Sequence, residues 1–267
     1  MRSPHPPRWS VYAVLGGGLL LSATIALRSP TSHPAPTELI GFPLGPSTPF
    51  DPKVIVPTDA RGAGAGTAFS VDSRGVWLTA RHVVEGCSRV VVVTAPGRGV
   101  AARAKLDPAS ESALLFTAGG APALPIAAAV ELRRGALAFH PGFPKARAGE
   151  VASRLLRRET LVLPRRSEPV LAWVEIGHSA FLWGSLAGLS GAPALNAEGE
   201  VIAVTVAQAP RRHRVYTTTP AAMAAFLAAA GRLPTMQGPR PMSSEDYHAT
   251  ADRLRGRLSV AQVVCLD

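Results

Sequence analysis

The sequence contains little cysteine and comparatively few acidic residues. It has two cysteines, Cys87 and Cys265, and 18 Asp and Glu against 28 Lys and Arg, which gives a formal net charge of +10. No helix-turn-helix, zinc-finger or RNA-binding motif accompanies this charge, so no nucleic-acid partner is expected. The basic charge instead favours an anionic membrane surface or acidic partners, or it reflects a genome that is rich in arginine and alanine codons.

The sequence also lacks the motifs of two further kinds of site, a metal site and a phosphate-binding loop. No group of His, Cys and Glu has the spacing of metal ligands, so no metal is expected. The glycine-rich run at residues 62–66 lacks the Gly-Lys-Ser/Thr of a phosphate loop and leads into a strand-like run, so no nucleotide cofactor is expected either.

The N-terminal segment predicts the compartment. Residues 9–27 carry no charge and have about the ~20-residue length of a membrane span, whereas the apolar core of a signal peptide has roughly 7–15 residues. Arg2 and Arg8 precede this run and predict a cytoplasmic N-terminus at residues 1–8, with the rest of the chain outside the cytoplasm. Residues 9–27 are therefore predicted to be a transmembrane anchor, and a cleaved signal segment is the alternative.

Proline and glycine, 25 of each, divide the rest of the chain into short segments. Residues 28–52 form a proline-rich linker that favours extended conformations. From residue 53 onward, two series of short apolar runs separated by Gly, Pro and Asp turns predict an all-β fold of two antiparallel barrels or sandwiches. A helix with proline near its start and Gly231 at its end follows, and residues 232–267 contain a further helix and a strand-like tail.

The two cysteines predict a disulfide bond. An even number of cysteines outside the cytoplasm is typical of one disulfide, and two free thiols are the alternative. The tail S-V-A-Q-V-V-C, which ends at Cys265, alternates apolar residues but has no hairpin partner nearby in sequence. Docking of this tail on the first barrel would bring Cys265 to Cys87, which follows a predicted helical turn.

Ser190 is the candidate nucleophile. It lies in the run G-L-S-G-A-P, which begins at Gly188, and such runs commonly form turns. A serine hydroxyl becomes a nucleophile only with a base in reach and backbone N–H groups directed at the developing oxyanion. The glycines allow the amides of Gly188 and Ser190 to point into one concavity. Among seven histidines, His82 alone lies where a predicted strand breaks into a helical turn at the rim of a barrel.

Two motifs carry a family resemblance. The segment G-T-A-F-S-V-D-S-R-G-V-W-L-T-A-R-H-V-V-E-G resembles the histidine motif of trypsin/chymotrypsin-like serine proteases, in particular the bacterial Deg/HtrA-type branch. The segment G-L-S-G-A-P-A-L-N-A-E-G-E-V-I-A-V resembles the serine motif of the same branch, and G-A-L-A-F-H-P-G the strand that opens the second barrel. The chain order of histidine, acid and serine is also that of chymotrypsin. The resemblance covers about residues 60–230.

The resemblance implies a chymotrypsin-like architecture. Two antiparallel six-stranded barrels are expected at about residues 53–125 and 133–220, within a protease domain at residues 53–231. By the same resemblance His82 is the general base, Ser190 the nucleophile, and Gly188 and Ser190 the donors of the oxyanion hole. The 36 residues after Gly231 are too few for the PDZ domain that many Deg/HtrA proteins carry.

The acid departs from the family pattern. Where the family has aspartate before a buried strand, this chain reads D-P-A-S-E-S-A-L-L-F, which aligns Glu111 with the acid. Glutamate has one more methylene, so either the backbone retreats or the side chain folds back. Asp107 is the rival, and the absence of a functioning acid is the third possibility.

The family pattern also locates a candidate specificity pocket. Its base falls near Gly184 and Ser185, and its wall on Thr205, Val206 and Ala207. None of these residues is charged, which favours a small or medium apolar side chain before the cut over lysine or arginine.

Three functions remain in competition at this point. The first is a serine endopeptidase of protein or peptide substrates, anchored in a bacterial inner membrane with its catalytic domain in the periplasm or cell exterior, or secreted after signal cleavage. The second is an inactive protease fold that serves as a binding or scaffold domain. The third, an α/β-hydrolase esterase, is disfavoured because its histidine follows its serine in the chain. The sequence does not predict an oligomeric state.

Overall fold

The computed structural model describes residues 41–55, 64–127, 129–182, 184–232 and 241–266. The predicted anchor at residues 9–27 lies outside these ranges. Among the residues within them, no helix combines the length and the apolar character that crossing a bilayer requires.

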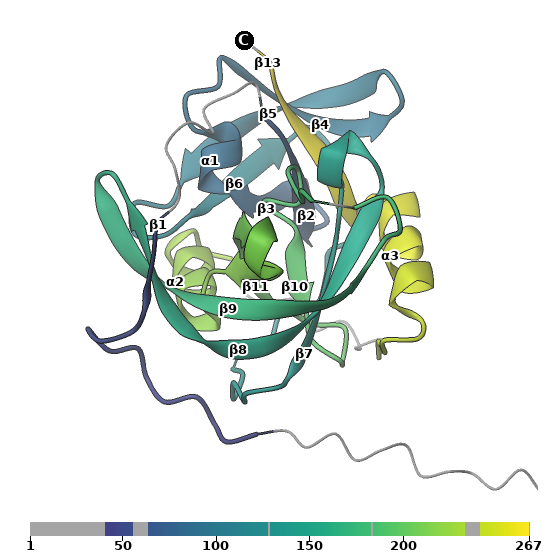
Figure 1. Cartoon of the computed structure of the whole chain (residues 1–267). Coiled ribbons are helices and arrows are strands. Elements are labelled where there is room, and N and C mark those ends of the chain that lie inside the picture. Colours follow the sequence, from purple (N-terminus) through teal and green to yellow (C-terminus); the bar gives the residue numbers. More distant parts are fainter. Residues whose placement is uncertain (1–40, 56–63, 128, 183, 233–240, 267) are drawn as a thin grey trace, which may run out of the picture. The chain divides into compact units, whose positions relative to one another are not determined.

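The first barrel is closed and has six antiparallel strands in the order β13-β2-β3-β6-β5-β4 (Figure 1). Their bounds are β2 Ala65–Asp72, β3 Val76–Ala80, β4 Arg89–Ala95, β5 Arg98–Leu106, β6 Ser112–Thr117 and β13 Val260–Leu266. Buried side chains such as Phe69, Leu78 and Leu114 fill its interior. The short β2–β3 turn ends at Gly75, whose φ of 92° suits glycine.

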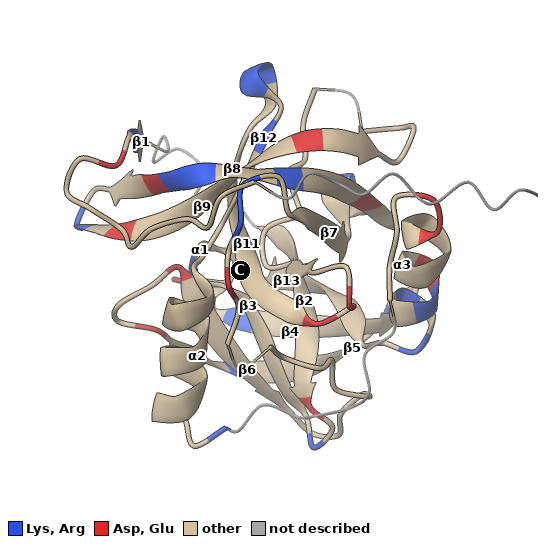
Figure 2. Ribbon diagram, turned by 90° about the horizontal axis from the view of Figure 1, so that it is seen from below, with Lys and Arg blue, Asp and Glu red and all other residues tan. Residues whose placement is uncertain are grey.

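The second barrel also has six antiparallel strands. Its order is β8-β7-β10-β11-β12-β9, and pairing of β8 with β9 closes it. The bounds are β7 Leu137–Gly142, β8 Gly149–Leu163, β9 Arg166–His178, β10 Pro193–Leu195, β11 Val201–Ala209 and β12 Arg214–Thr217. Trp173, Leu155 and Val215 belong to its core. Figure 2 shows Lys and Arg along the long β8 and β9 ribbons and in the turn before β12.

Short helical segments complete the described structure. They are α1 Arg81–Val84, α2 Pro220–Ala229, α3 Tyr247–Gly256 and the 3₁₀ turns Pro144–Ala146 and Pro210–Arg212. The predicted boundaries of α2 are confirmed: Pro220 occupies its first turn, the Thr219 hydroxyl accepts a hydrogen bond from Ala222 N at 3.2 Å, and Gly231 follows with φ 65°. The helical turn expected after β3 is α1.

The all-β fold with two six-stranded barrels is confirmed, but the range expected for the first barrel differs at both ends. The strand β1, Lys53–Ile55, pairs in parallel with β8 of the second barrel. The sixth strand of the first barrel is β13, which comes from the C-terminal tail and lies between β2 and β4. Closure of a barrel requires a strand that satisfies two free edges, and a strand distant in sequence fulfils this as well as a near one.

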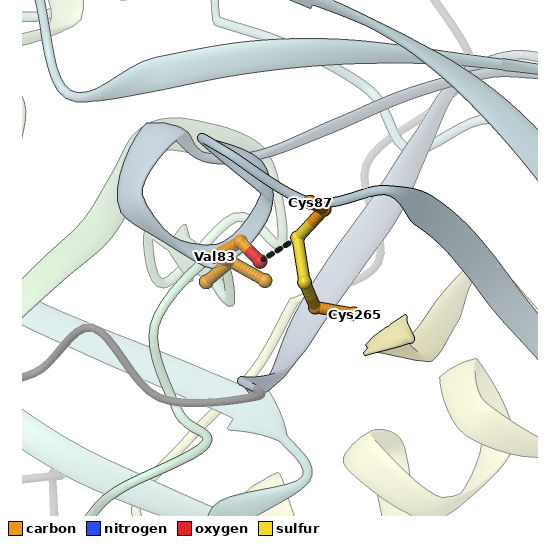
Figure 3. Close-up of a disulfide and its surroundings, with 3 residues drawn as sticks. All are labelled: Val83, Cys87 and Cys265. Atoms are coloured by element: carbon orange, nitrogen blue, oxygen red, sulfur yellow. Dashed lines mark hydrogen bonds between the residues drawn. A yellow bond between two sulfur atoms is a disulfide. The ribbon is translucent and has the colours of Figure 1, made fainter. Parts of the chain in front are cut away.

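The disulfide between Cys87 and Cys265 is present, with Cα atoms 5.5 Å apart and a sequence separation of 178 residues. Figure 3 shows it beside α1, where Cys87 Sγ lies 3.5 Å from the carbonyl oxygen of Val83. The pairing predicted from the tail is therefore confirmed. It attaches β13 to the segment that follows α1.

Candidate active site

His82 lies in the first turn of α1, directly after β3. Arg81 N donates to the carbonyl oxygen of Glu111 at 3.1 Å, which joins the start of α1 to the start of β6. Val83 and Val84 are buried and orient the helix, while 37% of the His82 side chain stays exposed. The imidazole is therefore held by its backbone at the barrel rim and still faces solvent.

Glu111 is the carboxylate that contacts His82. Its Oε2 lies 2.7 Å from His82 Nδ1 and accepts a longer bond, 3.3 Å, from His82 N. A carboxylate at Nδ1 favours the tautomer with the proton on Nδ1, which leaves Nε2 as an acceptor. Burial acts to raise the pKa of Glu111, but the hydrogen bond from His82 and the charges of His82 and Arg166 outweigh it and lower that pKa below its ordinary value.

Asp107, the rival acid, has a different role. Its Oδ1 accepts from Ala109 N at 3.0 Å and its Oδ2 from Ser110 Oγ at 2.5 Å. Both carboxylate oxygens thus stabilise the turn that leads into Glu111. Of the two candidate carboxylates, the geometry brings only Glu111 to His82.

Ser190 reaches the same region from the second barrel. Its carbonyl oxygen accepts a hydrogen bond from Thr67 N of β2 at 2.8 Å. A Cβ added to Gly66 would lie 2.5 Å from Val83 Cγ1 and 3.1 Å from Ser190 O, so α1 and the Ser190 backbone flank one glycine. Ser190 is half-buried, and no hydrogen bond joins its hydroxyl to His82 among the described residues. Such catalytic bonds are often long without substrate.

Gly191 allows the serine turn to approach the first barrel. Its φ is 88°, and an added Cβ would lie 1.9 Å from Thr67 O and 2.3 Å from Thr79 Oγ1. Any other residue would force the two barrels apart at this point. The glycine after the serine is therefore required by a close backbone approach as well as by its φ.

The Gly188 amide points away from the Pro144–Ala146 turn. The carbonyl oxygen of Ala187 accepts from Lys145 N at 2.5 Å, and because a trans peptide is planar, the Gly188 N–H points the opposite way. Thr67 Oγ1 donates to Gly188 O at 2.9 Å, which fixes the next peptide. Within the described part of the chain, the amides of Gly188 and Ser190 donate to no other residue, so both remain available.

The candidate pocket residues lie on two adjacent segments. Gly184 and Ser185 belong to the loop before the serine, and Thr205, Val206 and Ala207 belong to β11. Gln208, which the sequence analysis missed, joins these segments, because its Oε1 accepts from Leu186 N at 2.5 Å.

Thr205 differs from its expected role as a wall. Its hydroxyl lies 2.9 Å from Nδ1 of His140, which is fully buried and also contacts Ser153 Oγ at 2.8 Å. Burial lowers the pKa of His140 to about 3, so the ring is neutral. The Thr205 side chain thus faces the barrel interior and stabilises its core.

Arg166 and Glu168 also surround Glu111, and the sequence analysis missed both. The Arg166 guanidinium pairs with Glu111 Oε1, and Glu168 Oε2 accepts from Glu111 N at 3.0 Å. Charged residues beside a turn commonly remain in solvent, so the run R-R-S-E-P carried no usable signal.

The two barrels, with the histidine turn on one and the serine turn on the other, define the trypsin-like serine protease fold. The chain matches the trypsin-like peptidase domain over residues 66–204 and belongs to this family. It is homologous to HtrA-type serine proteases, which confirms the resemblance drawn from the two motifs.

Individual proteins resemble this chain in sequence or in fold. HhoA of Synechocystis sp., assigned as a serine protease, is 31% identical over 160 residues, which are 57% of this chain and 39% of HhoA. The chain thus spans about two fifths of that curated relative. The active form of the Rv3671c protease from M. tuberculosis has a TM-score of 0.52 at 20% identity, covering 75% of this chain and 96% of that one. The HtrA-type protease AlgW with a decapeptide has a TM-score of 0.52 at 18% identity, covering 62% and 51%.

Proposed function

We propose that this protein is a serine endopeptidase that hydrolyses peptide bonds through an acyl-enzyme. The observation that carries the proposal is the 2.7 Å contact between His82 Nδ1 and Glu111 Oε2, on a turn that flanks Gly66 together with the backbone of Ser190. A histidine held in this tautomer presents Nε2 as a base toward an incoming hydroxyl proton. Family membership supports the same reading.

In the proposed reaction, Ser190 Oγ attacks the scissile carbonyl carbon and its proton passes to His82 Nε2. The oxyanion accepts hydrogen bonds from the amides of Gly188 and Ser190, a type of interaction worth about 10²–10³ in kcat. The C–N bond then breaks, and His82 returns the proton to the leaving amine. Water hydrolyses the acyl-enzyme by the same steps in reverse. Glu111 holds the imidazole and stabilises its cationic form.

The substrate is proposed to be a protein or peptide with a small or medium apolar residue before the cut. The uncharged loop at Gly184 and Ser185 supports this, and Gln208 joins that loop to β11 through the hydrogen bond from Leu186 N.

We place the domain outside the cytoplasm, attached to a bacterial inner membrane through residues 9–27. The disulfide between Cys87 and Cys265 supports an oxidising compartment. A secreted form after signal cleavage is the alternative. A protease assay on membranes and on culture supernatant, with the full chain detected by antibody, separates the two.

An inactive binding or scaffold protein is the second candidate, favoured by the lack of a hydrogen bond from the Ser190 hydroxyl to His82 among the described residues. Labelling of the full chain with a fluorophosphonate decides between them. The wild type and a Ser73→Ala control, which changes an exposed serine in the β2–β3 turn, should label. Ser190→Ala should not label and should keep its fold, because it loses one hydroxyl. A folded wild type that fails to label would support the second candidate.

A further inference from the structure

The tip of the β8–β9 hairpin lies against Glu111. β8 ends at Leu163 and β9 begins at Arg166, so a two-residue turn carries the chain across. From β9, the Arg166 guanidinium pairs with Glu111 Oε1 and also donates to Ser110 O at 3.3 Å. The second barrel therefore contacts the carboxylate that the first barrel directs at His82.

The pairing of Arg166 has a clear physical reason. The Glu111 side chain is 5% exposed, and its Oε2 is occupied by His82, so Oε1 would be a buried charge without a partner. A buried carboxylate oxygen without a partner destabilises the ionised form strongly. Arg166 supplies the missing donor, and its side chain is itself only 19% exposed.

Glu168 holds the backbone of the same residue. Its Oε2 accepts from Glu111 N at 3.0 Å, and its side chain is buried. Its Oε1 is buried as well and has no hydrogen-bond partner among the described residues. The one hydrogen bond that the Glu168 carboxyl makes among the described residues is the bond that it accepts from the Glu111 amide.

We propose that Arg166 and Glu168 are positioning residues that keep Glu111 in contact with His82, so that the β8–β9 hairpin completes the catalytic group. This inference rests on the proposed peptidase function. It also explains how a glutamate serves where the family has aspartate. The longer side chain is held at both ends, by Arg166 at its carboxylate and by Glu168 at its amide.

Several charged groups act on Glu111 and decide the expected pH response. Those on the elements packed around it are Arg81, His82, Glu85, Asp107, Arg166 and Glu168. Removing the charge of Arg166 favours protonation of Glu111, and a protonated Glu111 no longer stabilises cationic His82. The activity that depends on ionised Glu111 is therefore lost at a higher pH, which moves the acidic limb of the rate profile toward higher pH.

Variants of Arg166 test the first half of the proposal in the full chain. Arg166→Met should lower kcat about tenfold at pH 7, with KM nearly unchanged, and should recover much of the loss at pH 9. Arg166→Lys should restore part of the loss. Arg165→Gln removes the same charge from the exposed neighbouring position and should match the wild type.

Glu168 tests the second half. Glu168→Ala removes the acceptor for the Glu111 amide and should lower kcat about tenfold, because a misplacement of about 1 Å has effects of that order or larger. Glu168→Gln keeps an acceptor oxygen and should stay within about twofold of the wild type. Both variants are compared at equal folded fraction, measured by circular dichroism, so that a difference in kcat reports the position of Glu111 and not the amount of folded protein.

A measurement that does not depend on activity distinguishes failure of this inference from failure of the proposed peptidase function. Nitrogen-15 chemical shifts of the His82 ring report whether Nδ1 carries the proton. In Arg166→Met and Glu168→Ala the Nδ1–H signature should weaken, whether or not the wild type labels with a fluorophosphonate. If Arg166→Met does not fold, the proposal is tested with Arg166→Lys and with the two Glu168 variants, Glu168→Ala and Glu168→Gln. Wild-type ring shifts and pH profiles in the folded variants would overturn the proposal.

Discussion

Replacing Glu168 with glutamine should stabilise the protein at alkaline pH and have little effect near pH 5. Burial raises the pKa of Glu168 from 4.5 to about 7, and the charges of Glu111 and Asp107 act in the same direction. The folded chain therefore holds this proton more tightly than the unfolded chain does. Between about pH 4.5 and pH 7 the wild type loses stability as pH rises, because unfolding releases the proton. Glutamine at 168 does not titrate and still offers an acceptor to Glu111 N.

The magnitude follows from the pKa difference. Raising a carboxyl pKa from 4.5 to about 7 corresponds to about 3 kcal/mol between the folded and unfolded chains. Because buried sites relax and admit water, we expect a gain of about 1–3 kcal/mol for Glu168→Gln at pH 8.5. Glu111 does not mask this effect: its pKa is lowered, so its stabilisation is lost only as pH falls below the ordinary carboxyl range.

Urea unfolding followed by tryptophan fluorescence at pH 5 and pH 8.5 measures the effect. All variants would carry Ser190→Ala to prevent self-digestion. Glu198→Gln removes the same charge from an exposed turn and serves as the control. An equal gain at both pH values, or no gain relative to Glu198→Gln, would refute the assignment of a raised pKa to a buried Glu168.

Other expectations concern the acid, the disulfide and the pocket. Glu111→Gln should lower kcat by about 10³-fold or more, since it favours the wrong tautomer of His82, and Glu111→Asp should also lose activity because the shorter chain leaves His82 or Arg166 unpaired; steady-state kinetics checks both. Cys265→Ser should lower the free energy of unfolding by about 2–5 kcal/mol and reduce Tm, as measured by thermal denaturation, with a non-reduced digest confirming the bridge in the wild type. A peptide library should show cleavage after Ala, Val or Leu, and Gln208→Ala should admit larger apolar residues; a basic preference contradicts the pocket assignment.

Local features of this protein were readable from the sequence because their causes are local. The apolar run before His82 predicts a strand, and the residues from His82 onward predict a short helical turn. The end of the strand next to His82 could therefore be located from the sequence. Pro220 and Gly231 mark the two ends of α2 through a restricted φ and a positive φ. Gly191 belongs to a motif in which close backbone approach excludes a side chain. The disulfide is not local, and it was predicted instead from the even number of cysteines and from a tail without a hairpin partner.

The tertiary structure decided which segments meet. A strand's alternation tells which face is buried but not which edge it pairs with, so the place of β13 between β2 and β4 and the pairing of β1 with β8 came only from the fold. The same holds for the acid, because Asp107 and Glu111 differ in what surrounds them, not in chemistry. Arg166 and Glu168 look like solvated hairpin residues in the sequence. They become partners of Glu111 because the second barrel brings a hairpin across a boundary that no local pattern encodes.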